Sequence, residues 1–304
     1  MDVGVIGAGA MGRNHVRVYS ELKNVGAVGV FDVNHTAAKD IGERHGAHVC
    51  NSVEDLLAKA EAVSICVPTQ HHAEIAKKAF AAGCSVLIEK PICASSKEAR
   101  ELMRTAPEDI CVGVGHIERF NPIVGEIKKI MDTPLYVEMK RHNPASARVK
   151  GSSVVEDLMI HDIDILQHIL FENKPCTLHV AGNPDVCSVL IQCGKVPVSL
   201  SASRKSSKKI RLIYIEQEEF TIEGDFMSQE VTIYRKPGQY HVEDERYVQE
   251  NIIEKVMVNK LEPLKLELGT FVDCVKSGHP FPITPSQAIR NLEMCESIRT
   301  GFSS

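Results

Sequence analysis

Short apolar segments alternate with segments of helical periodicity through the first 118 residues. The apolar segments are rich in Val and Ile, which is typical of strands buried on both faces, and the segments between them repeat apolar residues every three or four positions. The expected strands are 3–6, 27–31, 62–67, 85–88 and 110–114, and the expected helices are 11–22, 37–45, 53–59, 72–82 and 96–104. This alternation predicts a doubly wound parallel sheet with helices on both faces, a Rossmann domain.

The pattern changes near Arg119 to segments in which apolar and polar residues alternate. The expected strands are 135–142, 177–182, 186–193, 196–203, 208–216, 219–223 and 230–234. Hairpin turns are expected at Gly194-Lys195 and Gly224-Asp225, because glycine next to a polar residue is a common turn signal. Strands that follow one another without helices form a mostly antiparallel sheet.

Helical segments accompany this second sheet at 122–131 and 154–171, and two more are expected after Pro263 and Pro285. We therefore expect α/β architecture in two domains. Residues 1–118 form the dinucleotide-binding Rossmann domain. Residues 119–304 form an α+β domain with a large, mostly antiparallel open sheet that binds the substrate and mediates oligomerisation.

Composition and charge narrow the class of protein. The chain has 304 residues, of which 43% are hydrophobic and 25% charged, with a formal net charge of -5. These values are typical of an ordinary globular protein and argue against a general nucleic-acid binder, which carries a basic surface. Because no run of 18 apolar residues and no apolar signal core after Met1 occurs, we expect a cytoplasmic protein that does not bind membranes.

Ten cysteines are scattered along the chain, most of them within apolar segments. No Cys-x-x-Cys pair occurs, so structural zinc and a thioredoxin-type site are not expected. The sequence predicts buried free thiols.

A glycine motif follows the first expected strand. Gly7, Gly9 and Gly12, with Ala10 and Met11 between the last two, form Gly-x-Gly-x-x-Gly at the start of the first expected helix. The glycines allow a tight turn and a close approach of the backbone to a pyrophosphate, whose charge the free amides of the helix N-terminus receive. The alternative is a glycine turn that binds nothing.

Asp32 ends the second expected strand, 20 residues beyond Gly12, where a carboxylate binds the adenosine ribose hydroxyls. No Arg or Lys follows it to neutralise a 2'-phosphate, so we expect NAD rather than NADP; the alternative is an Asp that caps a helix or turn. Pro68, Thr69 and His72 follow the 62–67 strand and are expected to border the nicotinamide, although His72 could equally be a surface residue at a helix start.

Glu89, Lys90 and Pro91 follow the 85–88 strand, at the sheet edge where the nicotinamide is expected. The Lys90 ammonium can hold a substrate hydroxyl, stabilise a developing alkoxide or act as a base. The alternative is a solvated lysine at a strand end. We also predict a cis peptide bond between Lys90 and Pro91, a rigid turn that directs Lys90.

The 154–171 helix carries a row of ionisable residues. Asp157, His161, Asp164 and His168 are spaced i, i+4, i+7 and i+11, which places them on one stripe of an α-helix. A carboxylate one turn from an imidazole can orient it as a general base. Two alternatives remain: a solvated polar face, or a divalent-metal site formed by His161, Asp164 and His168. Because no other His or Cys cluster completes a metal shell, we expect no metal.

These motifs together resemble the Gfo/Idh/MocA family of NAD(P)-dependent sugar dehydrogenases over essentially the whole chain. The resemblance rests on the glycine motif followed by Asn14-His15, on Glu89-Lys90-Pro91 and on Asp157-x-x-x-His161-x-x-Asp164. It implies that Lys90, Asp157 and His161 form the catalytic group, that Glu89 and Lys90 also contact the cofactor, and that Lys90, Asp157 and His161 also bind the substrate. Met159 stands where members of the family commonly have Gly.

Two stretches, residues 115–122 and 157–164, resemble the branch of that family that oxidises the C3 hydroxyl of UDP-N-acetylglucosamine to a ketone. Arg119, Asn121 and Arg148 are the further substrate-binding residues we expect, with Arg141 and Lys150 as additional cations for a diphosphate. Two other functions stay open: an inositol or free-sugar dehydrogenase, and a non-catalytic NAD-binding sensor. Because the open sheet has apolar residues on both faces, we expect a homodimer or homotetramer formed through it.

Overall fold

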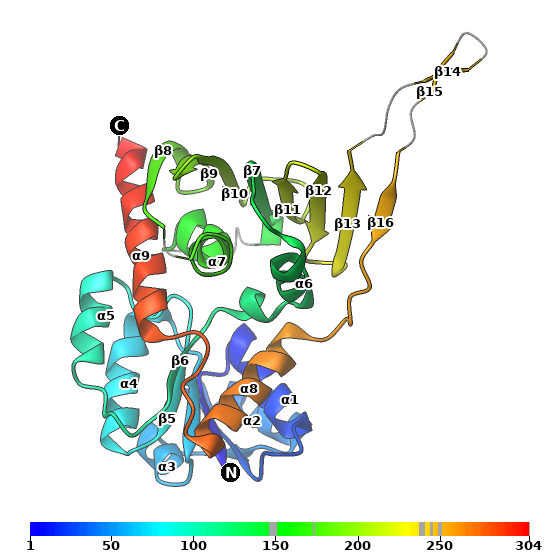
Figure 1. Cartoon of the computed structure of the whole chain (residues 1–304). Coiled ribbons are helices and arrows are strands. Elements are labelled where there is room, and N and C mark those ends of the chain that lie inside the picture. Colours follow the sequence, from blue (N-terminus) through cyan, green and yellow to red (C-terminus); the bar gives the residue numbers. More distant parts are fainter. Residues whose placement is uncertain (146–150, 173, 237–240, 244–245, 249–250, 304) are drawn as a thin grey trace. The chain divides into compact units, whose positions relative to one another are not determined.

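The computed structural model describes residues 1–145, 151–172, 174–236, 241–243, 246–248 and 251–303, which form two compact units (Figure 1). The first unit comprises Met1–Phe120 and Glu262–Glu293, and the second comprises Asn121–Leu261 and Met294–Ser304. The expected division, 1–118 and 119–304, differs from these units because residues 262–293 return to the first. The reason is apolar burial: Leu264, Leu268 and Phe271 of α8 (Pro263–Ser277) lie in the core of the first unit.

The first unit contains a six-stranded sheet of order β3-β2-β1-β4-β5-β6, in which every pair is parallel. The strands are β1 (Val3–Ile6), β2 (Val28–Phe31), β3 (His48–Val49), β4 (Ala62–Ile65), β5 (Ser85–Glu89) and β6 (Val112–Gly115). Every residue of β1, β4 and β5 is buried, as the continuous apolar segments predict. Strand β3 was not expected, because two residues carry no periodicity.

Helices connect these strands, and side chains cap several of their N-termini. The connecting helices are α1 (Ala10–Glu21), α2 (His35–His45), α3 (Val53–Leu57), α4 (His72–Ala81) and α5 (Ser96–Met103), and α8 and the first part of α9 (Pro285–Thr300) also belong to this unit. Asn34, Ser52 and Ser95 accept hydrogen bonds from the first turns of α2, α3 and α5. Helix α1 differs: its N-cap is Gly9, which supplies no side-chain hydrogen bond.

The second unit contains an eight-stranded sheet of order β16-β13-β12-β11-β7-β10-β9-β8. The strands are β7 (Tyr136–His142), β8 (Cys176–Asn183), β9 (Val186–Cys193), β10 (Val196–Ser203), β11 (Ile210–Glu216), β12 (Phe220–Asp225), β13 (Glu230–Arg235) and β16 (Ile253–Lys255). The β7–β10 pair is parallel and the other pairs are antiparallel, so the expected mostly antiparallel open sheet is confirmed. A separate two-stranded sheet consists of β14 (His241–Glu243) and β15 (Arg246–Val248).

One of the two expected hairpin turns is confirmed and the other is misplaced. Gly194-Lys195 joins β9 to β10. Gly224 instead lies within β12, and the turn follows Asp225, whose Oδ1 accepts hydrogen bonds from the amides of Met227 and Ser228. A Cβ atom on Gly224 would lie 2.7 Å from a methyl of Ile213 and 3.0 Å from one of Ile127, so glycine is needed there for close packing of α6 (Pro122–Ile130) on the sheet.

The expectation that the cysteines are free thiols is wrong for two of them. Cys176 and Cys193, which are paired across β8 and β9, form a disulfide, so they are not free thiols. Adjacent strands of an antiparallel sheet bring directly opposed cysteines within bonding distance, and this register is invisible in the sequence alone. The other eight cysteines are free thiols, five of them buried. Among the described residues, no helix has both the length and the apolarity needed to span a membrane.

Candidate active site

The carboxyl ends of β1, β2 and β4 surround a cavity of about 870 Å³ in the first unit. Ligands of doubly wound sheets bind beyond this edge, where the strand order reverses between β1 and β4. The lining includes the expected Gly7, Gly9, Ala10, Met11, Asp32 and Pro68. The cavity therefore brings together most of the residues that the sequence assigns to the cofactor.

The glycine motif has the geometry of a pyrophosphate cradle. A Cβ atom on Gly7, whose φ is +105°, would lie 2.6 Å from the carbonyl oxygen of Cys66, and one on Gly12 would lie 1.8 Å from that of Gly7. Only glycine fits at these two positions. Gly9 faces open space, and no side chain caps the amides of the first turn of α1. The residues present fit a dinucleotide phosphate, because amides and space are both available to it.

The Asp32 carboxylate is fixed at the edge of this cavity. Its Oδ2 accepts a hydrogen bond from the Ala8 amide at 2.6 Å, and its Oδ1 accepts one from the Asn34 amide at 2.7 Å. Lys78 also lines the cavity, but its Nζ lies 3.2 Å from Glu54 and 3.7 Å from Glu74, both carboxylates of the same lining. The lining therefore places three carboxylates, those of Asp32, Glu54 and Glu74, around the Lys78 ammonium.

Several lining residues were missed by the sequence analysis. They are Ile6, Phe31, Val33, Ser52, Val53, Glu54, Cys66, Val67, His71, Glu74, Ile75 and Lys78. Some directly follow strands, so the rule that ligands bind at carboxyl ends of strands could have found them. Glu54, Glu74 and Lys78 belong to α3 and α4, and only the packing of these helices shows that they face the cavity.

His72 does not line the cavity, contrary to expectation. It is 1% exposed, and its Nε2 and Nδ1 lie 2.9 Å from the Val67 carbonyl oxygen and 3.0 Å from that of Pro91. Burial lowers the pKa of the imidazole, although these hydrogen bonds work against that effect. His72 thus joins the end of β4 to the turn after Lys90. Its expected contact with the cofactor has no support in this geometry. Thr69, which begins a short 3-10 helix, is also not part of the lining.

Lys90 follows the last residue of β5 and is half-buried. The Lys90–Pro91 peptide bond is cis, which confirms the prediction. The neighbouring Glu89 is only 6% exposed: its Oε1 lies 3.0 Å from Nε2 of His15, and its Oε2 accepts a hydrogen bond from the Lys90 amide at 3.2 Å. Glu89 therefore lies under the turn that carries Lys90.

The helix expected at 154–171 is not a continuous α-helix. Two π-helical segments, η4 (Val155–Met159) and η5 (Leu166–Leu170), flank α7 (Ile160–Ile165). Because π-helical hydrogen bonds span one residue more than α-helical ones, the simple i, i+4, i+7 stripe does not hold along its length. Such π segments are frequent at functional sites.

The ionisable residues of this helix are not a solvated face. Asp157 and His161 are half-buried, and Asp164 and His168 are 1% and 8% exposed. The metal alternative has no support either, because the groups of ligand-type side chains found close together in the described chain do not include His161, Asp164 and His168. Asp157 and His161 are therefore the more exposed two of these four residues.

The expected substrate-binding residues lie in different environments. Nη1 of Arg119 donates a hydrogen bond to Gln287 at 2.9 Å. Asn121 is buried, where it caps α6 and donates to the Phe226 carbonyl oxygen at 3.0 Å, so its expected substrate contact has no support. Arg148 lies outside the described residues, as does Lys150.

Arg141 is not available to a diphosphate. Its side chain is 1% exposed, and its Nε and Nη2 donate to Oδ1 of the equally buried Asp162 at 2.9 and 2.7 Å. Its guanidinium also lies over the Phe226 ring, 5.2 Å from the centroid. The β7 position that looked like a substrate contact is therefore a buried ion pair.

Comparison with known proteins agrees with this arrangement. The sequence model of the Gfo/Idh/MocA oxidoreductases, described as having an NAD-binding Rossmann fold, matches residues 1–116. UDP-N-acetylglucosamine 3-dehydrogenase from Acidithiobacillus ferrooxidans is 30% identical over 294 residues, which cover 92% of this chain and 90% of that protein. The chain belongs to the Gfo/Idh/MocA family. It is an oxidoreductase with an NAD-binding Rossmann domain.

Other relatives within the family are more distant. Inositol 2-dehydrogenase from Cereibacter sphaeroides is 29% identical over 180 residues, or 56% of this chain and 54% of that protein. The solved structure of the Acidithiobacillus ferrooxidans enzyme superposes with a TM-score of 0.86 at 26% identity, covering 99% of this chain and 97% of the other. Levoglucosan dehydrogenase, solved with NADH and levoglucosan, has a TM-score of 0.84 at 17% identity over 100% and 97% of the two chains; it shares the fold.

Proposed function

We propose that the protein oxidises the C3 hydroxyl of UDP-N-acetylglucosamine with NAD, giving the 3-keto sugar and NADH. The observation that carries the proposal is the 30% identity to UDP-N-acetylglucosamine 3-dehydrogenase, which extends over 92% of this chain. The inositol 2-dehydrogenases are less similar, at 29% identity over 56% of this chain or 26% identity over 91% of it. Lys90, Asp157 and His161 are all present for the chemistry.

The proposed mechanism divides the work among these three residues. When bound, NAD would supply the acceptor for the hydride that leaves the alcohol carbon. His161 takes the hydroxyl proton, Asp157 orients His161, and the Lys90 ammonium stabilises the developing alkoxide. Glycines 7, 9 and 12 and the first turn of α1 hold the pyrophosphate, and Asp32 holds the adenosine ribose. We include Arg119 and Arg148 as residues that bind the diphosphate of the substrate.

A substrate screen tests this proposal. UDP-N-acetylglucosamine, UDP-glucose, free N-acetylglucosamine and myo-inositol are each supplied with NAD, and NADH absorbance is followed. We expect NADH with UDP-N-acetylglucosamine at the highest kcat/KM, and a C3 ketone in the product by NMR. Preference for myo-inositol or a free sugar would assign the other dehydrogenase function. NAD binding without NADH from any alcohol would indicate a sensor.

The choice of NAD over NADP is proposed to depend on Asp32. Replacing Asp32 by Ser removes the carboxylate that would repel a 2'-phosphate, so we expect kcat/KM for NADP to rise relative to that for NAD. The ratio is measured with both cofactors on wild type and Asp32→Ser. Glu43→Ser, an exposed carboxylate on α2, serves as the control and should leave the ratio unchanged. A wild type that already prefers NADP would contradict the assignment.

We also propose a homodimer or homotetramer formed through the eight-stranded sheet. Side chains alternate along β9, so that Cys187, Val189 and Ile191 are buried while Val186 and Leu190 are 39% and 55% exposed. Leu212 of β11 and Tyr234 of β13 are likewise exposed, at 41% and 38%. Large exposed apolar side chains on an open sheet face can be covered by a second copy of the chain. Light scattering coupled to size exclusion should give a mass that is a multiple of the protomer, and a monomer would refute the proposal.

A further inference from the structure

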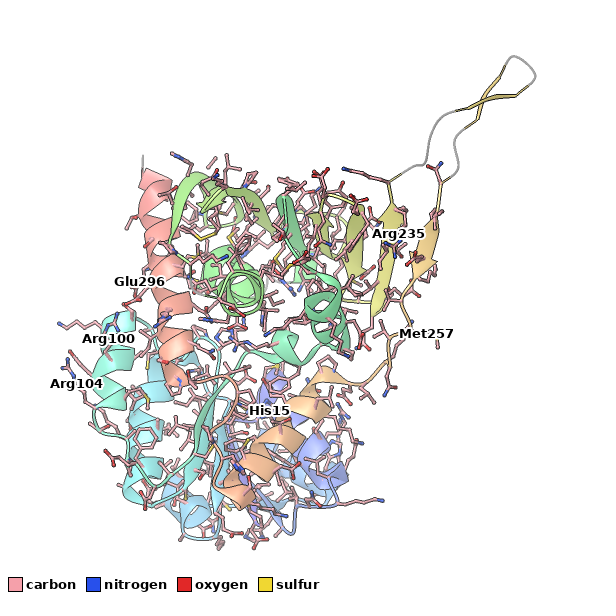
Figure 2. All side chains as sticks on the ribbon, in the orientation of Figure 1. His15, Arg100, Arg104, Arg235, Met257 and Glu296 are labelled. Carbon is pink, nitrogen blue, oxygen red and sulfur yellow. A yellow bond between two sulfur atoms is a disulfide. The ribbon has the colours of Figure 1, made fainter. Side chains whose placement is uncertain are left out.

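Three side chains of metal-ligand type converge where β3 leads into α3, in the first unit. They are His48, Cys50 and Asp55, and one ligand-type atom of each lies within 4.8 Å of such an atom of the other two. Side chains fill the interior of this unit in Figure 2, and the three residues lie at its boundary, because Cys50 is 1% exposed whereas His48 is exposed. We call these residues, together with Lys59, the β3–α3 cluster.

The local backbone directs the three side chains to one place. His48 begins β3, and Cys50 continues the strand, since its amide donates to the Val30 carbonyl oxygen at 2.9 Å. Residues two apart along an extended chain point to the same side. Asp55 belongs to the first turn of α3, and its Oδ2 accepts a hydrogen bond from the Asn51 amide at 3.0 Å. An outer hydrogen bond of this kind orients a carboxylate ligand, so Oδ1 is the oxygen available to the cluster.

A cation already lies among these ligand atoms. Nζ of Lys59 is 2.6 Å from Oδ1 of Asp55 and 3.3 Å from Nε2 of His48. An ammonium only donates hydrogen bonds, so Nε2 of His48 is the acceptor and carries no proton. The imidazole lone pair and the carboxylate oxygen therefore face the same point. Because the Lys59 side chain is 53% exposed, it can leave that point for water.

The ligand atoms of the cluster are those of a zinc site. Imidazole nitrogen, thiolate sulfur and carboxylate oxygen bind Zn²⁺ in proteins at about 2.0–2.3 Å, whereas Mg²⁺ and Ca²⁺ take oxygen ligands. Around one tetrahedral ion such atoms are about 3.3–3.8 Å apart, so the cluster has to contract by at most about 1.5 Å. The charges also balance, because the Cys50 thiolate and the Asp55 carboxylate together neutralise a dication.

A cavity of about 380 Å³ gives an ion access to the cluster. Its lining includes His48, Cys50 and Lys59, together with residues at the amino ends of β1 and β2. The cofactor cavity lies at the carboxyl ends of these strands, and the two cavities share no lining residue. The space accommodates the water that completes a four-coordinate shell with three protein ligands. The cluster is thus separate from the candidate active site.

We propose that His48, Cys50 and Asp55 form a binding site for Zn²⁺, and that Lys59 takes the place of the ion until it binds. On binding, the Cys50 thiol releases its proton to water and its sulfur bonds to the ion. His48 and Asp55 donate electron pairs without losing a proton, and no group is oxidised or reduced. The sequence analysis expected no metal because it considered His and Cys clusters, whereas Asp55 supplies the third ligand here.

A zinc titration of the full-length protein, first freed of metal by chelation, tests the proposal. Calorimetry in excess Mg²⁺ should give one Zn²⁺ per chain, with a binding enthalpy that depends on the buffer because a proton is released. His48→Ala, Cys50→Ser and Asp55→Asn should each weaken binding by at least about 10-fold, which is the smallest effect expected even for the loss of an outer-shell partner.

Lys59→Met distinguishes this site from adventitious binding to other thiols. It removes the competing ammonium, so its affinity for Zn²⁺ should exceed that of wild type, opposite to the effect of the ligand variants. The exposed position of Lys59 makes this variant informative even if a substitution of the buried Cys50 prevents folding. Cys274→Ser removes a free thiol elsewhere in the first unit and is the matched control, with unchanged affinity expected.

Cobalt identifies the bonded sulfur. Co²⁺ binds to the same kinds of ligand, and a thiolate bonded to it gives a charge-transfer absorption band. The band should appear in wild type, Lys59→Met and Cys274→Ser and be absent from Cys50→Ser. A band that persists in Cys50→Ser would assign the ion to another thiol and contradict the site.

The zinc titration also has outcomes that would overturn the proposal. No stoichiometric binding, or equal affinity in wild type and the ligand variants, would leave the β3–α3 cluster as an ion pair between Lys59 and Asp55 with His48 beside it. Weaker binding in Lys59→Met would show that Lys59 does not compete with the ion. Because these measurements need neither substrate nor NAD, they are independent of the proposed function.

Discussion

Replacing His161 by Ala should reduce kcat by about 10²- to 10⁴-fold, the usual contribution of a general acid-base group. The loss should appear with the substrate saturating, because a general base acts on the rate of the chemical step and not on substrate binding. NAD affinity should be unchanged, since His161 belongs to the second unit and the cofactor cavity to the first. Turnover is measured by NADH absorbance, and NAD binding by calorimetry or fluorescence.

The exposed His279 provides the matched control, and His279→Ala should retain wild-type turnover. A His161→Ala variant with nearly full kcat would exclude His161 from the mechanism. Loss of activity of the wild type on chelation, with recovery on adding a divalent ion, would instead assign His161 to a metal. Each result is obtained with the same assay.

Replacing Arg141 by Met should destabilise the protein by about 3–5 kcal/mol, because the substitution removes the buried cation that is paired with Asp162. Both side chains are 1% exposed, so water cannot take over the role of the guanidinium. The free energy of unfolding is measured by urea denaturation of the full chain. Lys140→Met, at an exposed position of the same strand, is the control and should have little effect.

The double variant Arg141→Met with Asp162→Leu distinguishes two quantities. One is the net contribution of the ion pair to the free energy of unfolding, and the other is the destabilisation caused by removing only one partner. Removing both charges together should restore much of the stability, since a buried ion pair contributes little beyond its own desolvation. If the single and double variants were equally unstable, packing around Phe226 would be the main contribution of Arg141.

The parts of the site that sequence predicted well are those encoded by neighbouring residues. Gly7, Gly9 and Gly12 act through local backbone geometry, and Asp32 through its place directly after a strand, so a short motif contains the information. The parallel sheet was predictable for a similar reason: its strands are continuous apolar segments. Lys90 could be singled out because it directly follows such a strand.

The failures concern polar residues whose environment depends on distant segments. Asn121 and Arg141 looked like substrate ligands, but Phe226 and Asp162, far away in sequence, bury them. His72 is held by the Pro91 carbonyl oxygen, which local periodicity could not reveal. The Cys176–Cys193 disulfide depends on strand register, and the π-helical segments on packing. Propensity and pattern describe local structure, whereas burial of a polar group is a property of the assembled core.

The late return of α8 to the first unit has a consequence for synthesis on the ribosome. Domains generally begin to fold as they emerge, starting from the N-terminus. The first unit cannot complete its core in this way, because Leu264, Leu268 and Phe271 are translated after the whole eight-stranded sheet. The nascent chain therefore carries an uncovered apolar surface beside α1 until α8 has been translated. A polypeptide shortened to residues 1–118 would keep that surface exposed and should aggregate, whereas one that ends after Glu293 contains every element of the first unit.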